Sequence, residues 1–193
     1  RIRTDDGKWL SHSTWGDNPI AFASEDGGSK VLRGYRTSGN LRLDYEIFPH
    51  FTLSGTYGFV RNQGRERDFR RNLTQYSPDD PNIVSAQTVD NGLSVDNFSD
   101  ILQNLNLLAK YENLFGRHSV SILGGVTAEW FQQENDFAST RDFLTEDIFT
   151  LNAGSSDPVN WNISGGASDW SLASFISRAT YSFDDKYLLE GSI

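Results

Sequence analysis

The chain contains no cysteine and no long apolar run. Without cysteine, its 193 residues form neither a disulfide framework nor a thiolate metal site. A membrane-spanning helix needs about 20 predominantly apolar residues, and no such stretch occurs in the sequence. The net charge of −9 argues against nucleic acid as a partner, because phosphate binding requires clustered Lys and Arg. These absences exclude a disulfide scaffold, leave no candidate transmembrane helix in this sequence and argue against nucleic-acid binding.

Catalytic motifs are also missing. The three histidines, His12, His50 and His118, are scattered, and no nucleophile elbow, paired-histidine zinc motif or phosphate-binding glycine loop occurs. Adjacent acids such as Asp79-Asp80 and Glu146-Asp147 are residue types that serve acid–base catalysis or calcium binding. In polar loops, however, they are expected to be solvated. We therefore predict no enzymatic activity, no cofactor and no catalytic or metal-binding residue.

What the sequence does contain is a set of three short turns. They lie at Phe48-Pro49-His50, at 114–117 and at 184–186, each between two long segments of alternating apolar and polar residues. On their other side, the segments are separated by polar stretches of roughly thirty residues. Short turns at one end and long loops at the other are typical of transmembrane β-barrels, with periplasmic turns and extracellular loops.

The alternation continues in phase across the first turn. Leu43 and Ile47 before the turn share one face with Phe51 and Leu53 after it, and a slip of one residue would move every side chain to the opposite face. Similar alternation in the other segments predicts an all-β fold, an antiparallel transmembrane β-barrel segment. We expect about six strands, with neighbours paired in sequence order, near 31–47, 50–66, 99–113, 117–134, 171–183 and 187–193.

The length of the alternating segments favours a barrel over a soluble β-sandwich. Membrane strands need about 9–11 residues, whereas strands of globular proteins are most often about 5–6 residues long. Aromatic residues on the apolar face beside the turns, such as Tyr45, Phe51 and Tyr181, match the aromatic belt at a membrane interface. The alternative is a soluble β-sandwich that uses the same aromatic residues as a glycan-binding module.

The barrel hypothesis assigns the two faces of the strands. We expect the following apolar residues to face lipid: Leu43, Phe51, Leu53, Tyr57, Leu107, Ile122, Val126, Phe175 and Leu189. The charged residues of the other face are expected to point into a wet lumen or onto a plug: Arg42, Asp44, Glu46, Lys110, Glu112, Glu129 and Arg178.

The last hairpin carries a family resemblance. Residues 181–193, with Asp184-Asp185-Lys186-Tyr187 at their turn, resemble a barrel hairpin of the SusC/RagA family of TonB-linked outer-membrane proteins. The hairpins at 40–59 and 102–130 and the segment Asp17-Asn18-Pro19-Ile20 are similar to that family as well. Residues 1–193 are then expected to be part of one TonB-dependent receptor β-barrel domain, with the plug domain and the remaining strands lying outside this sequence.

This resemblance implies a function. Members of the family are importers in the bacterial outer membrane that take up glycans or oligosaccharides, and in some cases peptides. They work with a surface lipoprotein of the SusD type and use energy delivered by the TonB complex. The expected partners are therefore a SusD-like lipoprotein, TonB, outer-membrane lipid and the substrate.

Four tryptophans are candidates for ligand or partner contact. Trp9, Trp15, Trp161 and Trp170 lie in the first and third polar stretches, which we expect to be loops outside the strands. Indole rings stack on sugar faces and contact peptide side chains. The alternative is that each tryptophan packs within its own loop.

Overall fold

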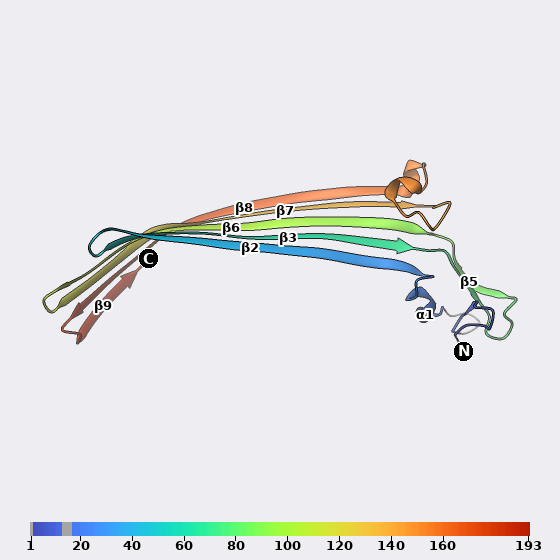
Figure 1. The fold of residues 1–193 in the computed structure, drawn as a ribbon, viewed down its shortest axis with the longest axis horizontal. Coiled ribbons are helices and arrows are strands. Elements are labelled where there is room, and N and C mark those ends of the chain that lie inside the picture. Colours follow the sequence, from blue (N-terminus) through green and yellow to red (C-terminus); the bar gives the residue numbers. More distant parts are fainter. Residues whose placement is uncertain (1, 13–16) are drawn as a thin grey trace. The chain divides into compact units, whose positions relative to one another are not determined.

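The computed structural model describes residues 2–12 and 17–193, and its main element is a six-stranded sheet. Neighbouring strands follow chain order, β2-β3-β6-β7-β8-β9 (Figure 1). The predicted order and antiparallel pairing are confirmed; in the last hairpin, for example, Phe183 pairs with Tyr187. The strands are β2 (Gly28–Phe48), β3 (Phe51–Arg70), β6 (Gly92–Phe115), β7 (His118–Arg141), β8 (Trp161–Phe183) and β9 (Tyr187–Ser192).

Several strands are longer than predicted at the ends away from the short turns. β3 continues to Arg70, β6 begins at Gly92, and β8 begins at Trp161. The polar stretches 67–98 and 135–170 are therefore partly strand, and the prediction that they are loops was wrong for those residues. The prediction followed apolar alternation, but backbone N–H and C=O groups require partners whatever their side chains are.

The three short turns adopt conformations that suit tight hairpins. Asp184 and Asp185 both have positive φ, at 55° and 51°, which is the requirement of a type I′ turn. The Lys186 N–H closes this turn by donating to the Phe183 carbonyl at 3.0 Å. Gly116 (φ 60°) and His50 (φ 75°) supply the positive φ in the other two turns.

A second, smaller sheet and short helices form within the stretches expected to be irregular. β1 (Trp9–Leu10) pairs in parallel with β4 (Leu73–Tyr76), which pairs antiparallel with β5 (Val84–Thr88). The helix α1 (Pro19–Phe22) is capped by Asn18, whose side-chain oxygen accepts from the Ile20 N–H at 3.0 Å. Two 3₁₀ turns, η1 (Leu151–Ala153) and η2 (Pro158–Asn160), follow β7.

The chain divides into two compact units, each containing part of every long strand from β2 to β8. Unit 1 comprises Arg1–Gly34, Gly64–Phe98 and Asn135–Gly166, and unit 2 comprises Tyr35–Gln63, Ser99–Glu134 and Ala167–Ile193. Among the described residues, every buried hydrophobic side chain belongs to unit 1. These side chains are Trp9, Leu10, Ala21, Phe69, Leu73, Leu93, Val95 and Phe143.

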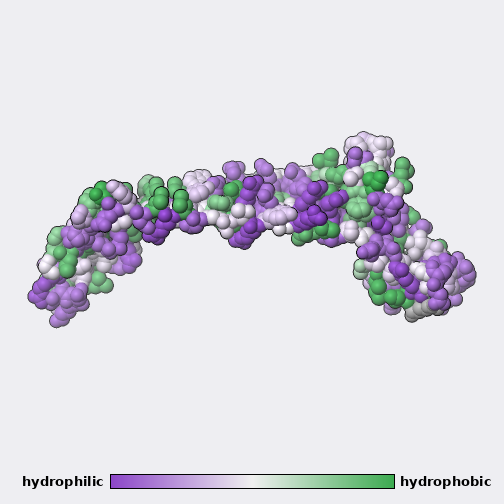
Figure 2. Space-filling model, viewed as in Figure 1, coloured by the Kyte–Doolittle hydropathy of each residue, from purple (hydrophilic) through white to green (hydrophobic). Residues whose placement is uncertain are grey.

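Unit 2 instead carries its apolar side chains on the surface. Residues predicted to face lipid are among the most exposed, including Phe175 at 84%, Leu189 at 71% and Leu43 at 66%. Figure 2 shows hydrophobic side chains reaching the surface of the molecule beside hydrophilic ones. A β-sandwich would cover such a face with a second sheet, and in unit 2 the described residues provide none.

In the part of the chain that the structure describes, no helix is both long and apolar enough to cross a membrane.

Candidate functional site

A polar cavity of about 500 Å³, which we call the rim cavity, opens in unit 1. It lies where β3, β6, β7 and β8 approach η2. Charged, amide and aromatic side chains share its lining, so that donors, acceptors and flat apolar surfaces are close together. The residues that carry these groups are Asp68, Arg70, Phe137, Arg141, Asn160 and Trp161.

Trp161 is held at the cavity by the segment that precedes it. Its indole Nε1 donates to the Ser155 carbonyl at 2.7 Å, while 47% of the residue remains exposed. The η2 turn before it is capped by Asp157, whose side chain accepts from the Val159 N–H at 3.1 Å. Asn160 donates to Asp142 Oδ2 at 2.8 Å. These bonds fix the ring but leave much of its surface free to contact a ligand.

Within unit 1, the buried side chain of Asn91 fastens the start of the segment 142–160 to the start of β6. Its Oδ1 accepts from the Phe143 N–H at 2.8 Å, and its Nδ2 donates to the Phe143 carbonyl at 3.1 Å. The same amide lies 3.2 Å from Glu146 Oε1. Asn91 is only 2% exposed, so these contacts replace the water that the amide would otherwise bind.

Aromatic packing holds the rest of this segment. Phe69, Leu93, Val95 and Phe143 form a buried cluster against which Phe149 packs. The Phe69 ring meets Phe143 edge-on at 5.4 Å and stacks on Phe149 at 4.7 Å. Such pairs add stabilisation beyond their buried area. Sequence reasoning missed this cluster because Phe143 and Phe149 lie outside any alternating pattern.

The rim cavity has the chemistry of a binding site. Arg70 and Arg141 supply charged donors, Asp68 supplies an acceptor, and Thr140 Oγ1 is buried without a hydrogen-bond partner. Across residues 2–12 and 17–193, no group of His, Asp or Glu side chains is arranged to hold a metal ion. The cavity therefore suits a polar ligand with hydroxyl, amide or charged groups, to which Phe137 and Trp161 add aromatic surface.

The other candidate tryptophans occupy different surroundings. Trp9 is 8% exposed, donates to Asp26 Oδ2 at 2.9 Å and carries the Arg3 guanidinium 3.7 Å from its ring centre. Trp170 is 45% exposed and stacks on Phe131 with 5.8 Å between ring centres. Trp15 lies outside the described residues.

The predicted location of three tryptophans was wrong. Trp9 belongs to β1, and Trp161 and Trp170 belong to β8, because strand pairing continues into the polar stretches. The structure brings only Trp161 of the described candidates to the rim cavity. The role of these tryptophans in ligand or partner contact stays a prediction.

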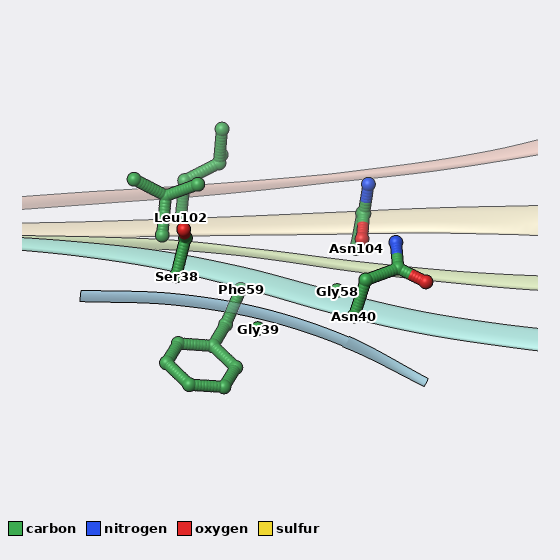
Figure 3. Close-up of a pocket in the computed structure, with 8 residues that line it drawn as sticks. Ser38, Gly39, Asn40, Gly58, Phe59, Leu102 and Asn104 are labelled. Atoms are coloured by element: carbon green, nitrogen blue, oxygen red, sulfur yellow. The ribbon is translucent and has the colours of Figure 1, made fainter. Parts of the chain in front are cut away.

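Unit 2 contains a shallow groove around Gly58, between Asn40 of β2 and Asn104 of β6. Figure 3 shows Phe59 projecting from the side of the sheet opposite to Ser38, Leu102 and Asn104, as strand alternation requires. A Cβ on Gly58 would lie 2.4 Å from Asn104 Oδ1, so the Asn104 side chain would have to move if residue 58 carried one. Asn104 Oδ1 is buried without a partner and offers an acceptor to a group placed on this face.

Charges in unit 2 are paired along the face predicted to be lumenal. Arg42 Nε lies 2.8 Å from Asp44, and Lys110 Nζ lies 2.6 Å from Glu112. Arg178 reaches across to Glu190 on β9 at 2.7 Å. At the short turns, Arg117 forms a two-pronged ion pair with Asp184 and joins the β6–β7 turn to the β8–β9 turn.

Comparison with known proteins identifies relatives for most of this chain. No family model matches it. The curated protein TonB-dependent receptor P3 from Formosa agariphila is 26% identical over 174 residues, which cover 89% of this chain. That match spans only 16% of the relative, so the chain corresponds to a small part of its length.

Solved structures share the fold. The structure of the RagAB peptide transporter matches 84% of this chain and 17% of its own, with a TM-score of 0.70 at 17% identity. The RagAB peptide importer in its closed-closed state matches 97% of this chain and 20% of its own, with a TM-score of 0.75 at 15% identity. The predicted resemblance to the SusC/RagA family and the predicted fold class are confirmed. The six strands do not close a barrel by themselves.

Proposed function

We propose that this chain, a SusC/RagA-like segment of barrel wall, serves in a TonB-dependent transporter that imports nutrients across the bacterial outer membrane. All of residues 1–193 then belong to one barrel domain, and the plug and remaining strands lie elsewhere in the transporter. The substrates are glycans or oligosaccharides, or peptides. A SusD-like lipoprotein and the TonB complex are its partners.

The observation that carries this proposal is the match to the closed-closed RagAB importer over 97% of the chain. The curated relative, a TonB-dependent receptor, supports it at the level of sequence. Both relatives are receptors or transporters by name, which favours transport over catalysis. We propose that this segment performs no catalytic step, in keeping with a cavity that offers binding groups.

The two faces of the sheet suit a wall between lipid and water. Exposed apolar side chains such as Leu43, Leu53 and Ile122 occupy one alternating phase, and the ion pairs Arg42–Asp44 and Lys110–Glu112 occupy the other. A charge on the lipid side near the midplane costs about 2–4 kcal/mol for Arg or Lys. We therefore assign the apolar phase to lipid and the charged phase to the lumen.

The rim cavity is the proposed place of ligand contact in this segment. Asp68 and Arg70 share the even-numbered phase of Thr56 in β3, which we assign to the lumen. Trp161 adds an exposed ring at the same cavity. Trp170, on β8 in unit 2, is a second candidate contact, whereas the packing of Trp9 supports a structural role for that residue.

The experiment uses the full-length parent protein, tagged and expressed in its own outer membrane. We expect a SusD-like lipoprotein to copurify with it, and deletion of the gene to abolish uptake of an oligosaccharide or peptide. A transport-deficient mutant of an unrelated outer-membrane porin serves as the control for membrane integrity. Recovery of no lipoprotein, together with unchanged uptake after deletion, would reject the importer.

A further inference from the structure

We propose that a second cavity, on the phase opposite to the rim cavity, binds the phosphate group of an outer-leaflet lipid. We call it the arginine pocket. Its volume is about 310 Å³, and it is lined by Arg33, Arg65 and Arg67 beside Phe69 and Phe149. All of its lining residues lie in unit 1. The inference rests on the proposed membrane location of the barrel.

The pocket gathers three positive charges without a carboxylate. No Asp or Glu lines it, and within the described residues none of the three arginines forms an ion pair. The neighbouring Lys30, on the other phase of β2, pairs with Glu66 at 2.6 Å. Like charges on adjacent strands repel one another, so a bound anion would relieve a repulsion that the chain itself leaves uncompensated.

Arg67 is held in place for such a ligand. Its Nη2 donates to the Phe149 carbonyl at 2.6 Å, and its guanidinium lies 5.6 Å from the centre of the Phe149 ring. Its Nε is buried without a hydrogen-bond partner. A buried charged donor without an acceptor is unfavourable, and a phosphate oxygen is an acceptor that matches the planar guanidinium.

The strand phase identifies the source of the phosphate. The pocket residues of β2 and β3 all have odd numbers, as do Leu41 and Leu43 of β2 and Leu53 of β3, in the phase assigned to lipid. The rim cavity uses the even-numbered residues Asp68 and Arg70 of β3 instead. An anion in the arginine pocket therefore comes from the membrane side of the wall and not from the transport path.

The place of the pocket in the strand order agrees with this source. Arg33 lies in β2, 15 residues before Phe48, toward the end of the strand away from the short turn. In a barrel with short periplasmic turns and long extracellular loops, that end is the extracellular one, where the outer headgroups lie. The exposed side chain of Val31 offers apolar surface to the body of a lipid beside its phosphate.

The test compares lipids bound to the full-length parent, purified from outer membranes in mild detergent. Native mass spectrometry would count adducts of a phosphorylated glycolipid (lipid A), its dephosphorylated form and inorganic phosphate alone. The variant is R33Q/R65Q, because neither side chain makes a recorded bond in the described part of the chain. The exposed Arg36 supplies the control R36Q.

We expect R33Q/R65Q to lower retention of the phosphorylated glycolipid at least tenfold, and R36Q to leave it unchanged. The dephosphorylated form and inorganic phosphate should bind the parent at least tenfold more weakly. Equal retention by parent and variant would overturn the inference, as would preference for inorganic phosphate. The inference would also be overturned if R33Q/R65Q lost uptake of an acidic substrate but retained the phosphorylated glycolipid.

Two further readouts separate this inference from the proposed function. The heat-induced gel shift of a folded barrel reports whether R33Q/R65Q still folds, and copurification of the lipoprotein reports whether the importer assembles. A folded variant that retains both lipoprotein and glycolipid contradicts only the arginine pocket. A parent that neither enters the outer membrane nor captures a lipoprotein contradicts the importer.

Discussion

Unit 1 and unit 2 differ in where they place their apolar side chains. Unit 1 buries Phe69, Leu93 and Phe143 against one another, as a water-soluble domain does. Unit 2 contains no buried hydrophobic side chain among its described residues and leaves Leu43 and Phe175 mostly exposed. A sheet of this kind can be stable only if something else covers the apolar face, and in a barrel wall the cover is lipid.

The difference between the units indicates which interactions constrain the side chains in each of them. In unit 1 the polar segments fold back on the strands and carry their own core, so packing between side chains decides stability. In unit 2 most strand segments alternate between apolar and polar side chains, as expected for a wall with lipid on one side and water on the other. The effect of a substitution should therefore depend on the unit that carries it, and five sets of variants test this difference.

The largest effect is expected in the core of unit 1. Phe143→Ala removes a ring that is 7% exposed and should lower the stability of unit 1 by about 3–5 kcal/mol. Hydrogen exchange in the full-length parent should then rise in 142–160. Leu144→Ala changes the adjacent side chain, which is fully exposed, and should leave exchange unaltered. Equal exchange in the two variants would contradict a soluble-type core.

The next effect tests the face of unit 2. Leu53→Arg and Ile122→Arg place a charge in the lipid phase and should lower folding stability in bilayers by about 2–4 kcal/mol. Thr56→Arg and Ser121→Arg place it in the lumenal phase and should have a much smaller effect. The measurement is urea titration of barrels folded into vesicles, and matched tolerance at all four positions would argue against a membrane wall.

A smaller effect is expected at Asn91. Asn91→Ala leaves the Phe143 N–H without its buried acceptor, at a cost of about 1–3 kcal/mol. Limited proteolysis should cut the segment 142–160 faster. The exposed Gln87, changed to alanine as a control, should not alter the rate; an identical cutting rate in both variants would show that Asn91 does not hold the segment.

Trp161 tests the rim cavity as a ligand site. A stacking contact contributes about 0.5–1.5 kcal/mol, so Trp161→Ala should raise the apparent KM for uptake by roughly 2–12-fold. The maximal rate should not change. Trp130→Ala, in the apolar phase of β7, is the control. A fall in the maximal rate with a constant KM would point to a structural role for Trp161.

The smallest effect is expected at the turns. The ion pair between Arg117 and Asp184 is largely exposed, with 67% and 39% of the side chains accessible, and exposed pairs contribute about 0–1 kcal/mol. Arg117→Ala should therefore shift the urea midpoint only slightly. A loss comparable to that of Phe143→Ala would mean that the turns, and not the core of unit 1, dominate stability.

The sequence was sufficient to predict what alternation controls. The six strands, their order and the short turns at His50, Gly116 and Asp184 all follow from period-two patterning and turn chemistry. The two faces of unit 2 could be separated for the same reason, since the adjacent residues Arg42 and Leu43 point to opposite sides of β2.

The sequence was insufficient where packing between distant segments decides the structure. The parallel pairing of Trp9 with Gln75 joins residues far apart in the chain, and no local sequence pattern predicts it. The segment beside the rim cavity is held by the hydrogen bond from Asn91 to the Phe143 carbonyl. The arginine pocket includes the hydrogen bond from Arg67 to the Phe149 carbonyl. Arg65 and Arg67 alternate with Glu66 and Asp68 in the sequence, and only the strand phase places the two arginines on one face and the two carboxylates on the other.

The most direct test of a lipid-facing wall is a single-cysteine scan of residues 105–111 in β6 of the full-length parent, in a cysteine-free background. This segment has no cysteine of its own. Each cysteine would be exposed in intact outer membranes to a membrane-confined thiol reagent and to a water-soluble one. We predict that positions 105, 107, 109 and 111 react from lipid and that 106, 108 and 110 react from water. Uniform reactivity with the water-soluble reagent at all seven positions would contradict the account.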